Sequence, residues 1–334
     1  MAAPLNQAAW LVEADCPLKV DVAPLPTAGS GELVVRNAAI AINPLDWHMR
    51  DAGVFIQQWP AILGCEVACE VHTIDLVSGR PQDGAFALYT AIPADKAAIL
   101  PDAISFIDGV VIPFALEAAV CALSPKERGS VMPGISTPAL GLPYPSLEGP
   151  ASSLGKTLVV YGGSSSVGSM TTQLAAAAGI NVISVTGTHN IELSKRCGAT
   201  QVFDYKDPSV IEKVVDAVRK SGFEFVGIFD AISIPETYVH DFAILAKLGG
   251  GHLACTHPPP PAADVPANVE AGMIFAVNDI VTPVWREYVT PALETRRLQR
   301  LPPHTVVGKG LEQIQDALKR SKAGVSATKL VLVL

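Results

Sequence analysis

The sequence has few cysteines, and no two of them have C-x-x-C spacing. The six are scattered over 334 residues: Cys16, Cys65, Cys69, Cys121, Cys197 and Cys255. Scattered cysteines in a chain of this length are typical of reduced, buried thiols in an intracellular protein. The N-terminal residues also lack the basic region and the continuous apolar run of a signal peptide. We therefore expect a cytoplasmic protein.

No stretch of the sequence has the uninterrupted apolar composition of a membrane span. Residues 97–123 are the most apolar long stretch, but they contain Pro101, Asp102, Asp108, Pro113 and Glu117. A bilayer span would not carry these residues. We therefore expect no membrane partner.

Positive charge is scarce in the first half of the chain. Residues 1–155 contain 7 Lys and Arg against 16 Asp and Glu, whereas residues 156–334 contain 17 against 16. Binding to a phosphate backbone requires patches of Lys and Arg, so the sequence argues against a nucleic-acid partner. The apolar fraction of 49% allows a sizeable core, and the length suggests about two domains.

The first part of the chain has the pattern of a β-rich, barrel-like domain. Short β-rich runs alternate with turn signals, as at 33–35, 39–42 and 85–90. Residues 103–123 are expected to be helical. Residues 124–155 are rich in proline and glycine, which indicates a connecting segment between domains.

From residue 156 onward, expected strands alternate with expected helices. The strands are 157–161, 182–185, 201–205, 225–229 and 252–255, and the helices are 170–178, 192–197, 209–220 and 236–247. This alternation predicts an α/β fold with a parallel, doubly wound sheet. The tail is expected to form a helix over 311–322 and a last strand over 329–334.

A glycine- and serine-rich turn, residues 162–168, follows the first strand of this second part. Small residues allow the backbone to approach a pyrophosphate, and the helix N-terminus supplies free N–H groups and a favourable dipole. Ser165 replaces the middle glycine of the G-x-G-x-x-G pattern. A tight turn without a ligand is the alternative interpretation, and the repeated β–α units after it disfavour that alternative.

Several segments resemble the medium-chain dehydrogenase/reductases. They are NPLDWHMRDAG (43–53), ILGCEVACEV (62–71), DGAFALYTAIPADKAAILPD (83–102), GGSSSVGSMTTQLAAAAG (162–179), TGTHNIELSKRCGATQVFDY (186–205) and GVSATKLVLVL (324–334). They are most similar to zinc-free, quinone-oxidoreductase-like members, and in particular to fungal trans-acting enoyl reductases that serve polyketide synthases. The resemblance implies a GroES-like catalytic domain over 1–123, a connecting segment over 124–155 and a Rossmann NADPH-binding domain over 156–280. It also implies a C-terminal segment, 281–334, that returns to the catalytic domain.

The sequence departs from this family pattern in two places. Zinc-dependent members carry Gly-His-Glu where this chain has Gly64-Cys65-Glu66, and they carry a four-cysteine lobe that is absent here. A catalytic zinc needs three protein ligands, so we expect no metal. Relatives also place a strand pair between the counterparts of Val71 and Asp83, where this chain is shorter by roughly two dozen residues. We therefore expect the first domain to be shortened near 72–82.

The resemblance implies roles for individual residues. The predicted cofactor contacts are Asp46, Trp47, His48 and Met49 at the nicotinamide; Gly163, Ser164, Ser165, Ser166 and Val167 at the pyrophosphate; Gly187, Thr188, His189 and Asn190 at the adenosine ribose; Lys195 and Tyr205 near the 2′-phosphate; and Val325 and Ser326 in a closing tail. The predicted substrate-pocket residues are Glu117, Ala118, Cys121, Met273, Ile274, Phe275, Ala276 and Val277. Plain core packing is the alternative for this second set, and a solvated helix charge is the alternative for Lys195.

His48 is the candidate catalytic residue. Relatives often have Lys at this position, and a histidine can donate a proton near neutral pH. A surface histidine without a catalytic role is the alternative.

The resemblance implies an NADPH-dependent enoyl reductase that transfers hydride to an α,β-unsaturated acyl or polyketide thioester. No acid directly follows the second Rossmann strand, which ends Val185-Thr186-Gly187-Thr188, so a 2′-phosphate would meet no repulsion there. A polyketide synthase is the implied partner, and the protein is expected to be a monomer or a homodimer. A quinone or small-enone reductase and a catalytically inactive NADPH-binding protein remain open as alternatives.

Overall fold

The computed structural model describes residues 5–69, 73–75, 83–132, 135–148, 153–276 and 279–334. The chain divides into two compact units. Unit 1 comprises Met1–Phe114, Trp285–Glu294 and Pro303–Leu334, and unit 2 comprises Ala115–Val284 and Thr295–Pro302. From the sequence we expect a catalytic domain over 1–123, a connecting segment over 124–155, a Rossmann domain over 156–280 and a C-terminal segment over 281–334. Most of that C-terminal segment lies in unit 1.

Unit 1 is built from two antiparallel-rich sheets. The smaller has the order β2-β1-β4, with β1 at Asn6–Leu11, β2 at Lys19–Ala23 and β4 at Ala61–Ile62. The larger has the order β17-β18-β3-β5-β6-β8, and β7 also pairs with β3. Its strands are β3 Glu32–Ile42, β5 Glu66–Cys69, β6 Thr73–Asp75, β7 Tyr89–Pro93, β8 Ala97–Ala98, β17 His304–Lys309 and β18 Lys329–Val333.

Strand β3 organises the larger sheet. The two expected runs, 33–35 and 39–42, form this single strand, which pairs with β7 over its first half and with β5 and β18 over its second. Residues 39–42 are all buried, because this half has a neighbouring strand on each side. The prediction of separate strands at 33–35 and 39–42 is wrong, because β3 is continuous from Glu32 to Ile42. The expected strand at 85–90 was also wrong in its start, since β7 begins at Tyr89 and Ala87 makes only an isolated bridge to Ala8.

The segment after Val71 still contributes to the sheet. β6 pairs with β5 on one side and with β8 on the other. The shortening was expected near 72–82, and of these residues 72 and 76–82 lie outside the described residues. The described part of the shortened region is thus a paired strand of three residues rather than an open edge.

The helices of unit 1 are α1 Pro44–Ala52, α2 Phe106–Gly109, α9 Thr290–Glu294 and α10 Ile314–Lys322. Unit 1 also contains a π-helix at Trp285–Val289 and short 3-10 helices at Ala94–Lys96 and Leu311–Gln313. The single helix expected over 103–123 is instead two helices, α2 and α3 Pro113–Leu123. The segment Phe106–Leu123 has the length and the mean hydropathy, 2.0, of a membrane span, but 78% of it is buried inside the protein. Burial of this kind is what a core helix shows.

Unit 2 contains a six-stranded sheet that is parallel throughout, in the order β13-β12-β11-β14-β15-β16. Its strands are β11 Lys156–Tyr161, β12 Asn181–Thr186, β13 Gln201–Asp204, β14 Glu224–Asp230, β15 Gly251–Cys255 and β16 Val269–Met273. The strand order reverses direction between β11 and β14, which is where doubly wound folds bind ligands. The predicted α/β fold is confirmed.

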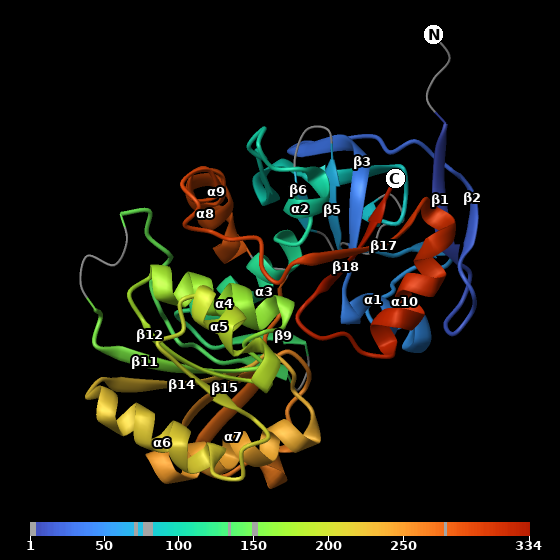
Figure 1. Cartoon of the computed structure of the whole chain (residues 1–334). Coiled ribbons are helices and arrows are strands. Elements are labelled where there is room, and N and C mark those ends of the chain that lie inside the picture. The colour runs from blue at the N-terminus through green and yellow to red at the C-terminus, as the bar shows by residue number, and fades with distance from the viewer. Residues whose placement is uncertain (1–4, 70–72, 76–82, 133–134, 149–152, 277–278) are drawn as a thin grey trace. The chain divides into compact units, whose positions relative to one another are not determined.

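Helices cover both faces of this parallel sheet. Figure 1 shows α4 and α5 on one face and α6 and α7 on the other. Their bounds are α4 Ser166–Ala177, α5 Ile191–Arg196, α6 Val210–Ser221 and α7 Pro235–Leu248. Unit 2 also contains α3 from Ala115 onward, α8 Thr282–Val284 and short turns at Thr188–Asn190, Ala262–Asp264 and Asp279–Val281. The segment 124–155, expected to be only a connector, also forms a hairpin of β9 Gly129–Met132 and β10 Ile135–Thr137.

Candidate functional site

The turn between β11 and α4 has the shape of a phosphate cradle. Gly162 has φ of +76°, a conformation that side chains with a Cβ rarely adopt. A Cβ on Gly168 would lie 2.3 Å from the carbonyl oxygen of Gly162, so the first turn of α4 packs directly on the loop. Ser165 caps this helix by accepting a hydrogen bond from the Gly168 N–H at 3.0 Å. Small residues are therefore required here, and they leave helix N–H groups at the carboxyl end of the central strand.

Two predicted cofactor residues are joined directly. Ser164 accepts hydrogen bonds at its hydroxyl from Thr186 Oγ1 at 2.6 Å and from Asn190 Nδ2 at 3.2 Å. Thr186 ends β12, and Asn190 lies in the turn that follows it. The phosphate turn and the expected ribose segment thus form one hydrogen-bonded edge of the sheet. Gly187 also lies here, because a Cβ on it would be 3.3 Å from the Tyr205 ring.

Two charged contacts near this edge were not foreseen from the sequence. Lys195 pairs with Glu192 at 2.7 Å on the exposed side of α5. Asp204, at the end of β13, accepts a hydrogen bond from the Thr188 hydroxyl, and this bond lowers the pKa of its carboxyl. Strand pairing places Asp204 beside Thr186, so a carboxylate stands near the end of β12 although no acid follows that strand in sequence.

The loop after β14 supports the glycine turn from the other side. A Cβ on Gly162 would lie 2.5 Å from the Ile232 side chain, so the two loops are in close contact. Asp230 holds its loop by accepting hydrogen bonds from the Ile232 N–H at 2.8 Å and from the Thr237 hydroxyl. Asp241 is fully buried, and burial together with the neighbouring Asp230 raises its pKa well above its ordinary value. No local sequence pattern indicates this acid pair, because Asp230 lies on β14 and Asp241 on α7.

Helix α1 presents the predicted nicotinamide-end residues in unit 1. Asn43 caps the helix, and its N–H donates to the Asp46 carboxylate at 2.7 Å. The rings of Trp47 and His48 are stacked with centroids 3.6 Å apart. Both side chains are partly exposed, whereas Asp46 and Met49 are buried. Of the four predicted residues on α1, Asp46 and Met49 thus pack into the interior, and Trp47 and His48 lie partly at the surface.

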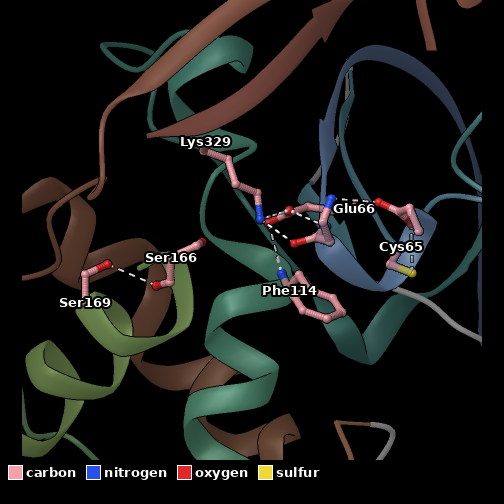
Figure 2. Close-up of polar contacts among 8 residues, drawn as sticks. Cys65, Glu66, Phe114, Ser166, Ser169 and Lys329 are labelled. Carbon is pink, nitrogen blue, oxygen red and sulfur yellow. Dashed lines mark hydrogen bonds and ion pairs between the residues drawn. The ribbon is translucent and has the colours of Figure 1, made fainter. Parts of the chain in front are cut away.

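A buried polar cluster, composed of Asn43, Asp46, Cys65, Glu66 and Lys329, lies beneath α1. The Cys65 thiol donates to Asp46 at 3.4 Å. Glu66 forms an ion pair with Lys329 at 2.7 Å and accepts a hydrogen bond from the Asn43 side-chain amide at 3.0 Å. Figure 2 shows Lys329 reaching Glu66 from a separate strand. The family resemblance implies a cofactor contact for Asp46. Cys65 and Glu66 stand in the segment where zinc-dependent members carry Gly-His-Glu, and buried packing is the alternative for Cys65.

Asp46 has a strongly shifted ionisation. Complete burial raises the pKa of its carboxyl to about 7, and the negative charge of Glu66 acts in the same direction. The hydrogen bonds from Asn43 and Cys65 and the charge of Lys329 oppose this shift without cancelling it. Asp46 therefore exchanges a proton close to neutral pH.

The residues expected to line the substrate pocket are largely buried. Glu117, Ala118 and Cys121 lie on α3 and are each no more than 2% exposed. Met273 and Ile274 are also buried, whereas Phe275 and Ala276 are partly exposed, and Val277 lies outside the described residues. In the predicted closing tail, Val325 and Ser326 are exposed. The substrate-pocket role of the first set and the closing role of Val325 and Ser326 stay predictions.

The structure offers no arrangement of protein ligands for zinc within the residues that it describes. Among them, no group of three or more His, Cys, Asp and Glu side chains is placed to hold a metal ion. All six cysteines are free thiols, and five of them are buried. Metal-free function stays a prediction for the whole chain.

Comparisons with known proteins bear on this arrangement. The family described as "Alcohol dehydrogenase GroES-like domain" matches residues 29–80, and that described as "Zinc-binding dehydrogenase" matches residues 166–268. The chain is 67% identical over 347 residues to "Dehydrogenase orsE" of Emericella nidulans, covering 98% of this chain and 99% of the relative. It is 31% identical over 357 residues to "Trans-enoyl reductase himH" of Aspergillus japonicus, covering 99% and 98%.

A solved structure of similar fold is the quinone oxidoreductase from Thermus thermophilus, which was also determined in complex with NADPH. It has a TM-score of 0.67 at 20% identity and covers 98% of this chain and 100% of that chain. The chain belongs to the medium-chain dehydrogenase/reductase family and is an oxidoreductase with a GroES-like and a Rossmann-type domain. The predicted family and fold are thereby confirmed. The 347 aligned residues exceed the 334 of this chain, so the dehydrogenase of Emericella nidulans has residues without a counterpart here.

Proposed function

We propose that the protein is an NADPH-dependent enoyl reductase that reduces the carbon–carbon double bond of an α,β-unsaturated acyl or polyketide thioester. The main support for dinucleotide binding is the phosphate cradle. There Ser164, just before α4, accepts hydrogen bonds from Thr186 and Asn190. The relatives named trans-enoyl reductase support the choice of substrate.

The residues of the cradle fit a dinucleotide cofactor. The glycines let the turn pack tightly against its protein neighbours, because an added Cβ would collide with Ile232, Ser184 or the Gly162 carbonyl. The N–H groups at the start of α4 can bind the oxygens of a pyrophosphate. When bound, the cofactor supplies the hydride. The protein then has to orient the substrate, exclude water and deliver one proton to the α-carbon. His48 is the candidate for this proton, because its ring is partly exposed beside Trp47 on α1.

Preference for NADPH over NADH is part of the proposal. Lys195 lies on α5, and its ammonium could leave Glu192 for a 2′-phosphate at little cost, because exposed ion pairs are weak. Thr188 and Tyr205 supply hydroxyl groups at the same edge. Asp204 opposes this preference through its negative charge, although it is already engaged with Thr188.

The proposed partner is a polyketide synthase that presents its acyl chain on a carrier. The relatives named trans-enoyl reductase support this partner. A cytoplasmic location and metal-free catalysis are proposed with it, and the six free thiols are consistent with a reducing compartment.

The test is a turnover assay with purified protein. NADPH oxidation would be followed with crotonyl-N-acetylcysteamine as a thioester surrogate and with a quinone and a small enone as competitors. We expect the saturated thioester as product, with NADPH the better cofactor. Turnover of the quinone or the enone, but not of the thioester, would favour a quinone or small-enone reductase. NADPH binding without turnover of any substrate would contradict the proposal and favour an inactive binding protein.

The cofactor site is tested with a matched pair of glycine variants. A Cβ on Gly163 would lie 1.9 Å from Ser184 Oγ, whereas a Cβ on Gly129 would meet nothing within 4 Å. Gly163→Ala should therefore abolish NADPH binding, and Gly129→Ala should leave it unchanged. Equal binding by both variants would show that the cofactor does not use this turn.

A further inference from the structure

Lys329 stands out in unit 1 because it is a buried ammonium far in sequence from the groups it contacts. It is 3% exposed, and its partner Glu66 is fully buried. Its ammonium also donates to the side-chain oxygen of Asn43, 286 positions away in the sequence. Buried charges are retained only when they are paired and hydrogen-bonded, so these contacts define the position of the Lys329 side chain.

Both carboxylate oxygens of Glu66 have partners. Oε2 receives the Lys329 ammonium and the Asn43 amide, and Oε1 accepts the main-chain N–H of Phe114 at 3.0 Å. Phe114 lies in the first turn of α3, so Glu66 caps that helix with a negative charge. Rotation of the carboxylate would break contacts on either side.

Asn43 connects the same ion pair to α1. Its side-chain oxygen faces Lys329 and its side-chain nitrogen faces Glu66, so the two opposite charges fix the orientation of the amide. Asn43 is also the N-terminal cap of α1, and its main-chain N–H binds Asp46. Through Asn43, Lys329 is therefore connected to α1, the helix that carries Trp47 and His48.

We infer that Lys329 is a positioning residue: from strand β18 it holds Glu66 and Asn43, and through them it fixes the N-termini of α1 and α3. This inference rests on the proposed function insofar as α1 carries the candidate proton donor. It assigns the C-terminal strand a role in catalysis without contact between Lys329 and the substrate. Figure 2 shows the Lys329 ammonium and the Phe114 main-chain nitrogen on the Glu66 carboxylate.

The test compares Lys329→Met with Lys329→Arg and with Lys319→Met. Arginine keeps the buried charge, and Lys319 is an exposed lysine of α10 that pairs with Asp316, three positions away on the same helix. Lys329→Met should lower kcat by about tenfold to a hundredfold, the scale expected for misplaced reacting groups. The Kd for NADPH should change by a smaller factor than kcat, because the phosphate cradle lies in unit 2 and only the predicted nicotinamide contacts on α1 would be displaced. Lys329→Arg should recover most of the loss, and Lys319→Met should match the unmodified protein.

A second measurement does not depend on turnover. Hydrogen exchange in Lys329→Met should accelerate at the amides of α1 and of the first turn of α3, while β11 and α4 keep their protection. Unchanged exchange in α1 and α3 would overturn the inference, even if the enzyme proved to have another substrate. An equal acceleration in β11 and α4 would also overturn it, since it would show general destabilisation. A double variant, Lys329→Met with Glu66→Gln, covers the case in which the single variant fails to fold, because it removes both members of the buried ion pair. It should fold and show the same local acceleration.

Discussion

Asp46 allows a direct test of how burial controls ionisation in unit 1. Its pKa is about 7 in the folded protein, against an ordinary value of 3.8. At most pH values between 3.8 and about 7, Asp46 is therefore protonated in the folded protein and ionised in the unfolded chain. The stabilisation from protonated Asp46 is complete below the unfolded pKa and is lost as the pH rises through about 7. Asn at this position cannot ionise, so Asp46→Asn should remove this pH dependence.

The size of the effect follows from the two pKa values. Each unit of pKa difference corresponds to about 1.4 kcal/mol. Between about pH 5 and about pH 8 the free energy of unfolding should fall by about 2.5 kcal/mol more in the unmodified protein than in Asp46→Asn. The other titrating groups are common to both proteins, so they cancel in this difference. The side-chain oxygen of Asn can still accept the hydrogen bond that Asp46 receives from Asn43.

Urea unfolding followed by tryptophan fluorescence is a suitable assay. All four tryptophans, Trp10, Trp47, Trp59 and Trp285, lie in unit 1, so their emission reports on the unit that contains Asp46. The measurement compares the two proteins at several pH values across the interval. Parallel curves, with a constant difference between the proteins, would show that Asp46 is already ionised at pH 5 and would refute the reasoning.

Three further predictions concern the cofactor and the reaction. Lys195→Ala should weaken NADPH binding by about tenfold and leave NADH binding nearly unchanged, since one charge-assisted contact to phosphate is worth about 1.5–3 kcal/mol; equal affinity of the unmodified protein for both cofactors, measured by fluorescence titration, would contradict this. Glu192→Gln should strengthen NADPH binding slightly, because it frees the Lys195 ammonium, and unchanged affinity in the same titration would argue against a phosphate contact. His48→Ala should lower kcat by about a hundredfold if His48 donates the proton, and turnover equal to that of the unmodified protein would assign the proton to another group.

Local sequence patterns predicted much of unit 2. The apolar runs at 157–161 and 182–185 correspond to β11 and β12, which are buried because helices cover both faces of the parallel sheet. The turn at 162–168 was recognisable because its glycines and serines meet steric and capping requirements within a few residues. Backbone conformation, turn chemistry and helix periodicity are short-range properties, so a short window of sequence is enough to reveal them.

The tertiary structure alone decided which charged groups meet. Lys195, next to the expected phosphate site in sequence, pairs with Glu192, while strand pairing brings Asp204 beside Thr186. Lys329 meets Glu66 because β18 and β5 flank the same strand, β3. Burial removes Lys329 and Glu66 from water, so each needs the partner that the strand order supplies. The sequence by itself determined the family, the sheet and the phosphate turn, whereas the buried charges of unit 1 acquired their partners only on folding, because electrostatic pairing depends on distance in space.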